Sequence, residues 1–275
     1  MKKAITAITF LDVVFLLLLS VSGSIAGAVG DVLYYFAFAL PVLLGVVYSR
    51  RNKDEEAEPV LLKVLPDRKS VGYALPIIVP FICVVLLISF LTSLILTKLG
   101  FSETTDVSGN LFGVIVKHAV LPAFFEEALF RFIPLMLLIP YSKKNALAVS
   151  SVMFAAVHCS LFQIPYALMA SFVLSLTALA TGSVFPCIII HFLNNVASIF
   201  FMRYSGIPYF NLIFFLSLGV VCAVSVAIIV LKRDKYKKIF QELKEDKCNV
   251  EFTPSTIMFV AMTLVIGALN LWQSL

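Results

Sequence analysis

This sequence has unusually few charged residues. Only 13% of its 275 residues are Asp, Glu, Lys or Arg, where a soluble domain has roughly 25%. Hydrophobic residues make up 61% of the chain, and its mean hydropathy is +1.02. A water-soluble domain of this length could not hide so much apolar surface. The composition therefore excludes a soluble enzyme and predicts an integral membrane protein that has the lipid bilayer as its solvent.

Paired cysteines, repeats and alternating polar patterns are also missing. The five cysteines form no CxxC pair, which argues against a metal knuckle or a disulfide framework. No internal repeat or low-complexity tract separates one part of the chain from another. No alternation of polar and apolar residues suggests a membrane barrel. What is left is a series of apolar runs, which predicts an all-α polytopic transmembrane helix bundle and a single membrane domain over residues 1–275.

The apolar runs are the most abundant feature of the chain, and a spanning helix needs about 20 such residues. We expect spans at 4–21, 32–49, 73–97, 110–138, 145–160, 162–181, 184–202, 209–231 and 254–274. The run 145–160 is short. The run 110–138 is long, and Pro122 and Pro134 are expected to kink or end it. The pattern therefore predicts eight to nine spans, with the polar core motifs lying between about 110 and 203.

Basic residues gather in three of the expected connections and predict the orientation. These are the segments 50–72 and 232–252 and the turn at Lys143 and Lys144. With nine spans, all three fall on the side of the N-terminus, which the positive-inside rule makes cytoplasmic. We expect the two long segments to be cytoplasmic loops of a cell-membrane protein. The net charge of +5 thus reflects topology. Acids such as Glu55 interrupt the basic runs, so no nucleic-acid partner is expected.

A few polar residues lie within the expected spans, where transferring a polar side chain from water into the membrane costs free energy. No Asp, Glu, Lys or Arg occurs between Asn145 and Met202, yet this stretch holds two of the three histidines. An ionisable group in a span costs at least about 2.5–3.5 kcal/mol and is by default a candidate functional residue. The candidates in this stretch are His158, His191 and Asn195, and those in the preceding span are Glu126, Glu127 and Arg131.

Helical spacing organises these groups. Glu127 and Arg131 are four residues apart, so they share a helix face and can pair. Glu126 points about 100° away from Glu127, which leaves its carboxylate free for proton transfer. His191 and Asn195 also share a face, where an imidazole and an amide could hold a developing oxyanion.

His158 lies on another helix, where it is expected to meet Glu126 across the bundle. A carboxylate and an imidazole together can bind and deprotonate a water molecule, or they can ligate a metal ion. Each residue also has a structural interpretation: the Glu127–Arg131 pair as a helix anchor, and a single histidine as a contact between helices. Their conjunction in helices almost free of charge favours a hydrolytic site.

Three short motifs carry a family resemblance. Glu126–Arg131 reads EExxxR, Phe154–His158 reads FxxxH, and His191–Asn195 reads HxxxN. In order and rough spacing they resemble the CPBP family, which contains the CAAX proteases and bacteriocin-processing enzymes and is also called the Abi family. The resemblance covers roughly residues 113–201. Outside it, the first three and the last two spans match only in being hydrophobic.

The resemblance implies an intramembrane endopeptidase that depends on glutamate. Glu126 would be the general base and would activate water together with His158. His191 and Asn195 would stabilise the oxyanion, while Glu127 and Arg131 would support the site. No cofactor is expected. A zinc ion held by Glu126, His158 and His191 is the less favoured alternative, because the chain has no HExxH helix.

The resemblance leaves the substrate open. A prenylated CAAX peptide, a bacteriocin leader and another membrane protein would each fit as the peptide or protein partner. The main alternative function is a non-catalytic membrane scaffold or a bacteriocin self-immunity protein, as some members of such a family have no demonstrated proteolysis. A transporter is less favoured, because no inverted repeat or paired broken helix is visible in the sequence.

Overall fold

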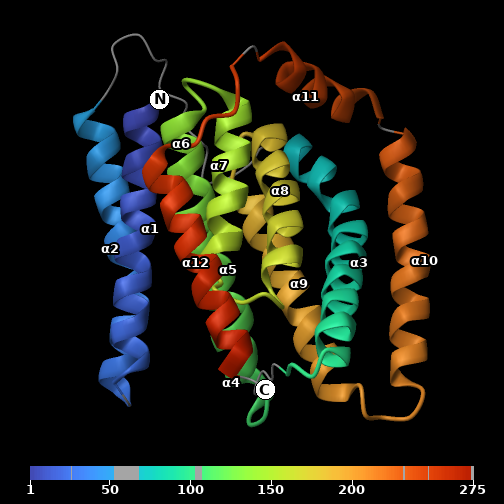
Figure 1. Cartoon of the computed structure of the whole chain (residues 1–275). Helices are drawn as coiled ribbons and strands as arrows, with labels where there is room; N and C mark the ends of the chain where they lie inside the picture. Colours follow the sequence, from blue (N-terminus) through green and yellow to red (C-terminus); the bar gives the residue numbers. More distant parts are fainter. Residues whose placement is uncertain (26, 53–67, 103–106, 232, 247, 274–275) are drawn as a thin grey trace.

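The computed structural model describes residues 1–25, 27–52, 68–102, 107–231, 233–246 and 248–273, and these residues form helices without any extended strand (Figure 1). The single-piece helices are α1 (Lys2–Gly23), α2 (Ala28–Arg51), α3 (Arg68–Lys98), α7 (Lys143–Ala156), α8 (Ile164–Thr181), α9 (Phe185–Tyr204), α10 (Phe210–Leu231), α11 (Arg233–Glu245) and α12 (Pro254–Gln273). Seven of them are long and apolar enough to cross a membrane. The predicted all-α polytopic bundle is confirmed.

The long span expected at 110–138 is one uninterrupted helix built from five pieces. These are α4 (Leu111–Ile115), the π-helical turn η1 (Val116–Val120), α5 (Leu121–Glu127), the π-helical turn η2 (Ala128–Phe132) and α6 (Ile133–Leu138). Of the two expected effects of Pro122 and Pro134, a kink or an end of the helix, the second does not occur. A wide π-helical turn precedes each proline and relieves its clash with the preceding turn.

Pro134 also explains one of the contacts between helices. Having no N–H, it cannot donate to the carbonyl of Phe130, four residues earlier. The hydroxyl of Ser150, on α7, donates to that carbonyl instead, at 2.5 Å. This hydrogen bond joins the motif-bearing helix to α7 and helps to fix the position of η2 along the axis of the bundle.

The short span expected at 145–160 ends earlier than predicted. Helix α7 starts where the Ser142 side chain accepts the backbone N–H of Asn145, and its 14 residues reach about 21 Å. That is less than the roughly 30 Å of a hydrocarbon core. The connection to α8 therefore lies inside the bundle, where the side chain of Asn270 on α12 donates to the carbonyl of Cys159. His158 lies in this internal connection.

The segment expected to be a cytoplasmic loop at 232–252 contains helix α11, so that expectation was incomplete. The helix lies across the end of the bundle (Figure 1), and an ion pair of 2.7 Å joins Glu242 to Lys143. Beyond it, Asp246 accepts from the hydroxyl of Ser142 and the backbone N–H of Lys144. Most of the loop expected at 50–72 lies outside the described residues.

The two ends of the bundle differ in charge. We call the end that carries Lys2, Lys3, Arg50, Arg51, Lys143, Lys144 and α11 the basic end; it lies uppermost in Figure 1. The opposite end holds the connection between α1 and α2, the residues that lead into α4, and the turn between α9 and α10. There, Arg203 donates to the carbonyls of Val107 and Gly109. The predicted gathering of basic residues at one end is present in the fold.

Candidate active site

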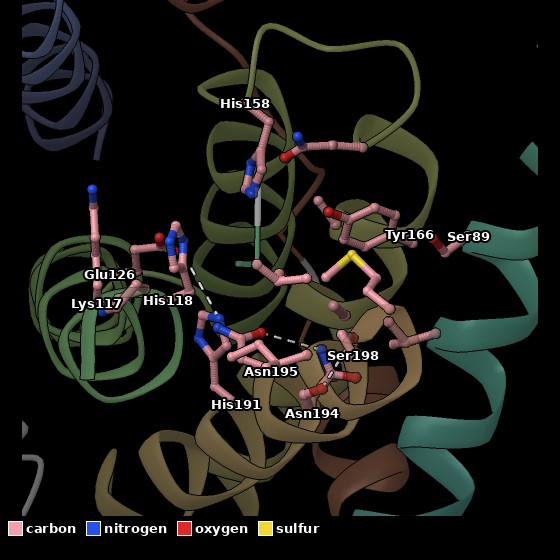
Figure 2. Close-up of a pocket in the computed structure, with 18 of the residues that line it drawn as sticks. Ser89, Lys117, His118, Glu126, His158, Tyr166, His191, Asn194, Asn195 and Ser198 are labelled. Atoms are coloured by element: carbon pink, nitrogen blue, oxygen red, sulfur yellow. Dashed lines mark hydrogen bonds and ion pairs between the residues drawn. The ribbon is translucent and has the colours of Figure 1, made fainter. Parts of the chain in front are cut away.

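A cavity of about 950 Å³ lies inside the bundle, between α2, α3, α5, α8 and α9. Figure 2 shows residues from several helices facing it. The four residues predicted to be catalytic all line it: Glu126, His158, His191 and Asn195. The two predicted supporting residues, Glu127 and Arg131, are fully buried behind its wall. The fold therefore brings together side chains from three separate motifs of the chain.

Glu126 and Glu127 are neighbours at the end of α5, but their side chains lie in different surroundings. The side chain of Glu126 is 19% exposed and faces the cavity, whereas that of Glu127 is 0% exposed. Glu127 Oε2 lies 3.4 Å from Nε of Arg131. The predicted pair is therefore present. Of these two glutamates, Glu126 is the one whose carboxylate faces the cavity and can reach a substrate.

Arg131 is a fully buried charge inside a membrane helix, and its surroundings make that tolerable. Its guanidinium carbon lies 4.3 Å from the ring centroid of Phe154, a distance suited to a cation–π interaction. Nη1 donates to the carbonyl of Phe130 at 3.3 Å. The contact to Glu127 is an ion pair without the alignment of a hydrogen bond, and Nη2 has no hydrogen-bond partner among the residues that the structure describes. Removing either charge would leave the other buried and uncompensated.

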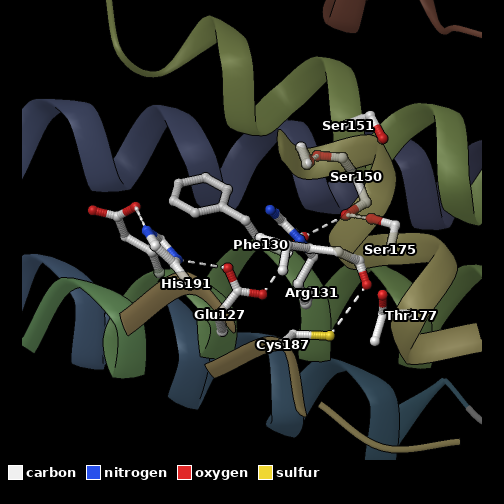
Figure 3. Close-up of polar contacts among 12 residues, drawn as sticks. Glu127, Phe130, Arg131, Ser150, Ser151, Ser175, Thr177, Cys187 and His191 are labelled. Atoms are coloured by element: carbon white, nitrogen blue, oxygen red, sulfur yellow. Dashed lines mark hydrogen bonds and ion pairs between the residues drawn. The ribbon is translucent and has the colours of Figure 1, made fainter. Parts of the chain in front are cut away.

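His191 joins the two glutamates, a contact that sequence spacing did not predict (Figure 3). Its Nδ1 lies 2.9 Å from Glu127 Oε1, and its Nε2 lies 3.8 Å from Glu126 Oε2. Since a carboxylate only accepts, the short contact assigns a proton to Nδ1. Nε2 is then the atom that faces Glu126 and the cavity. Glu127 thus fixes the orientation of the imidazole ring from behind.

The four groups Arg131, Glu127, His191 and Glu126 form a continuous chain of charges. Their charges sum to zero when Glu126 is ionised and His191 is protonated. They also sum to zero when Glu126 is protonated and His191 is neutral. Net neutrality is favoured where water is scarce, so one proton can be shared between Glu126 and His191. Such a shared proton suits general acid–base chemistry.

His158 lies just beyond the end of α7, where Cys159 at φ 47° turns the chain. Its Nδ1 lies 2.8 Å from the carbonyl of Phe154, which can only accept, so Nδ1 carries the proton. Nε2 is left as an acceptor toward the cavity. Sequence reasoning paired Glu126 with His158, but among the described residues the ion-pair partner of Glu126 is His191. The reason is that α9 packs on α5, while His158 is held by its own helix.

Asn195 has a neighbour that orients it. Nδ2 of Asn194 lies 3.4 Å from Oδ1 of Asn195, so the Asn195 oxygen is engaged and its own amide N–H groups are available to the cavity. Asn194 also lines the cavity. The Oδ1 atom of Asn194 is buried, with no hydrogen-bond partner in the described part of the chain. The HxxxN spacing gave no signal for this role of the intervening asparagine.

The wall of the cavity contains further polar residues that were not among the predicted site residues. They lie outside the three motifs in the sequence and include Tyr34, Ser89, Lys117, His118 and Tyr166. Figure 2 shows Lys117 and His118 on the same helix as Glu126, and Ser89 on the facing α3. Tyrosine and serine are common on lipid-facing and buried helix surfaces alike, so their spacing carries no signal that would single them out.

The donors of the alternative zinc site line one cavity but do not converge. Glu126, His158 and His191 all belong to its wall. In the part of the chain that the structure describes, however, no group of three His, Cys, Asp or Glu side chains is placed to hold a metal ion. These residues do not fit a three-ligand metal centre in this arrangement.

Comparison with known proteins gives one match. Residues 108–197 match the family described as type II CAAX prenyl endopeptidase Rce1-like. The matched segment begins just before α4 and ends within α9, so it contains all three motifs. No curated protein and no solved structure matches the chain. The match supports the resemblance to the CAAX protease family that the motifs carry.

Proposed function

We propose that the cavity of this chain, whose residues 108–197 match the family of type II CAAX prenyl endopeptidases described as Rce1-like, hydrolyses a peptide bond of a membrane-associated substrate. The observation that carries the proposal is the division between the two glutamates. Glu126 faces the cavity, whereas Glu127 is buried between Arg131 and His191. The substrate class is a lipidated CAAX-type peptide or another peptide that reaches the site from the membrane.

Glu126 is proposed as the general base. One O–H bond of a water molecule in the cavity breaks, its proton passes to a Glu126 oxygen, and the water oxygen attacks the carbonyl carbon of the peptide. His158 accepts the second hydrogen of that water through Nε2, which orients the attacking lone pair. This role agrees with the assigned proton on Nδ1 of His158, because only a ring nitrogen without hydrogen can accept.

The oxyanion that forms on the carbonyl oxygen needs donors within about 3 Å. Asn195 offers the N–H groups of its amide. His191 can donate from Nε2 only when it is protonated on both nitrogens, since the proton on Nδ1 is used by Glu127. The shared proton of the Glu126–His191 pair meets this need, because His191 is charged when Glu126 is ionised and ready to act as base.

Collapse of the tetrahedral intermediate completes the reaction. The C–N bond breaks, and the nitrogen takes the proton that Glu126 received from water. The carboxyl product retains the water oxygen, so every atom and proton is accounted for without a cofactor. Glu127 and Arg131 touch neither substrate nor water in this scheme, and they act by holding His191.

The test is cleavage of a prenylated CAAX peptide library by the purified full-length protein, with Glu126→Gln beside it. Glutamine keeps the shape of the side chain but cannot take the proton. Cleavage by the wild type and loss of at least roughly 10²-fold in kcat for the variant are expected. Equal cleavage by Glu126→Gln would contradict the role of Glu126 as base.

Two controls keep this test clear. Glu245→Gln removes an exposed carboxylate of α11 that lies at the basic end of the bundle, and it should cleave like the wild type. A chelator lane separates the mechanisms, since a reaction driven by Glu126 and His158 alone should be unaffected. Loss of cleavage with chelator that returns on adding zinc would instead establish metal dependence. The non-catalytic scaffold would be favoured if the wild type cleaved no peptide and the Glu126→Gln variant kept the biological phenotype of the wild type.

A further inference from the structure

Lys117 is a positive charge in the cavity wall that the proposed reaction does not use. It lies in the π-helical turn η1, six residues or roughly 9 Å after the start of its helix at Leu111, and it is exposed. It is the one Lys or Arg among the described residues of the wall. An unused charge within a membrane helix is costly, which makes Lys117 a candidate functional residue.

The charge of Lys117 is not compensated by the catalytic residues. The chain of Arg131, Glu127, His191 and Glu126 is neutral without it, and in the part of the chain that the structure describes no carboxylate forms an ion pair with Lys117. The cavity therefore carries one positive charge more than negative charges. A ligand with a single negative group would balance this charge, and the attraction is strong where water is scarce.

Lys117 and Glu126 lie on the same helix, so their spacing can be compared with the length of a peptide (Figure 2). They are nine residues apart, which corresponds to roughly 13 Å along a helix. Three residues of an extended peptide span about 10 Å, and the four-carbon stem of lysine supplies further reach. A peptide that runs along this helix with its scissile carbonyl at Glu126 thus brings the group three residues further on to the Lys117 ammonium.

A CAAX motif has a negative group at this distance. The motif is the last part of its chain, so a free carboxylate lies at the third residue after the prenylated cysteine. Resting on the proposed peptidase function, we propose that Lys117 binds the C-terminal carboxylate of the substrate. Nζ donates a charge-assisted hydrogen bond to the carboxylate. Lys117 then determines how far from the free chain end Glu126 attacks, and it takes no part in proton transfer.

The proposal is tested with three prenylated peptides of the same CAAX sequence. The first ends in a free acid, the second in an amide, and the third is extended by three residues, which moves the carboxylate about 10 Å further on. For the wild type, KM should be roughly 10- to 100-fold higher for the amide and for the extended peptide, with kcat little changed, because a binding contact is lost. Equal KM values for the acid and the amide would overturn the proposal.

Variants of Lys117 separate binding of the carboxylate from a structural role. Lys117→Gln should cleave the acid with the raised KM of the amide and should cleave the amide like the wild type. Lys117→Arg should keep the preference for the acid. Lys98→Met, which removes an exposed lysine of α3 outside the cavity wall, should behave like the wild type. An equal loss for both peptides in Lys117→Gln would show a structural role and would contradict the proposal.

Binding gives a measurement that does not depend on cleavage. Fluorescent acid and amide peptides are titrated into the Glu126→Gln protein, and the acid should bind roughly 10- to 100-fold more tightly. Adding Lys117→Gln should remove this difference. Equal affinities without that second substitution would reject the carboxylate site. A preference for the acid in a protein whose wild type cleaves no peptide would support the site and reject the peptidase, so the two failures are distinct.

Discussion

Glu126 and Glu127 are adjacent in the chain, but one residue of helical rotation gives them different partners. Glu127 contacts Arg131 through one oxygen and His191 through the other. Glu126 faces the cavity and lies 3.8 Å from His191. A buried carboxylate with two fixed partners orients a neighbouring imidazole, whereas a carboxylate beside a cavity can exchange protons with a substrate or with water. The two identical side chains thus differ in chemistry because of their surroundings.

The buried Glu127–Arg131 pair gives a prediction at this scale. Arg131→Met alone should lower the free energy of unfolding by about 3–5 kcal/mol, because it removes the ion-pair partner of one oxygen of the buried Glu127 carboxylate and leaves only the contact to His191. Adding Glu127→Gln should recover most of that loss, because it removes the second charge. The double variant should still have a lowered kcat with little change in KM, since a neutral amide in place of the Glu127 carboxylate no longer stabilises a protonated His191. Thermal unfolding and steady-state kinetics measure the two effects, and full activity of the double variant would contradict the positioning role.

His158 offers a prediction in which stability and activity separate. Its described hydrogen bond is to the carbonyl of Phe154 on its own helix, so His158→Ala should change the melting temperature little. Loss of the acceptor for water should lower kcat by at least roughly 10²-fold. Kinetics and thermal unfolding of the same preparation would show both. A variant that unfolds early and cleaves normally would show that His158 is a structural contact.

At the scale of elements, the π-helical turns and the short α7 position the motifs. The turn η2 carries Arg131, and Pro134 after it leaves the Phe130 carbonyl to Ser150 on α7. Helix α7 ends within the membrane, so His158 lies at cavity depth and not at a surface. A full-length α7 would carry His158 on a helix face, and the chain could not turn its ring toward the cavity in the same way.

Close packing of α2 on α6 predicts the effect of a single methyl group. A Cβ added at Gly45 would lie 2.8 Å from Cγ2 of Ile133, which is itself 1% exposed. Gly45→Ala should therefore destabilise the protein by about 1–3 kcal/mol through overpacking. Ile133→Ala in the same chain should recover part of that loss, because it makes room for the methyl group. Thermal unfolding of the single and double variants measures this, and additive effects would show that the helices adjust elsewhere.

The connection after α11 gives a prediction for pH. Burial opposes ionisation of Asp246, but the backbone N–H of Lys144, the hydroxyl of Ser142 and the backbone N–H of Cys248 outweigh it and lower the pKa of Asp246. A lowered pKa in the folded state means that this anchor contributes stability above the ordinary aspartate pKa of about 3.9. The contribution is lost as the pH falls through the lower folded-state value.

Hydrogen exchange measures this anchor. Exchange at residues 248–251 should be constant between about pH 5 and 8, after correction for the intrinsic rate, and should accelerate below about pH 4. Asp246→Asn should show fast exchange already at neutral pH, because the charge that the three donors stabilise is missing. If hydrogen exchange at residues 248–251 of the wild type accelerated as the pH rose across the neutral range, a group other than Asp246 would have to stabilise this segment.

At the scale of the whole molecule, the N-terminus and the end of α12 lie at opposite ends of the bundle (Figure 1). An odd number of membrane crossings places the two termini on opposite sides, and the nine spans expected from the sequence are an odd number. A reporter enzyme that is active only outside the cytoplasm should therefore be active when fused after Gln273 and inactive when fused after Lys144. Active fusions at both positions would be incompatible with the single orientation that the basic end predicts.

The sequence alone predicts the class of the fold and the candidate residues. Long apolar runs without a polar/apolar alternation predict helical spans, because in lipid only helices and closed barrels satisfy the backbone hydrogen bonds, and a barrel requires that alternation. The rarity of charge in those runs makes Glu126, Glu127, Arg131, His158 and His191 stand out. The Glu127–Arg131 pair is also predictable, since spacing by four residues on one helix brings side chains together whatever the rest of the chain does.

Only the tertiary structure decided how these residues meet. The contact between His191 and Glu127 joins side chains 64 positions apart, and helical periodicity says nothing about which faces of different helices will pack. The same holds for the early end of α7 and for the ion pair of Glu126 with His191. Local spacing determines which side chains share a face, whereas packing between helices determines which of those faces enclose the site.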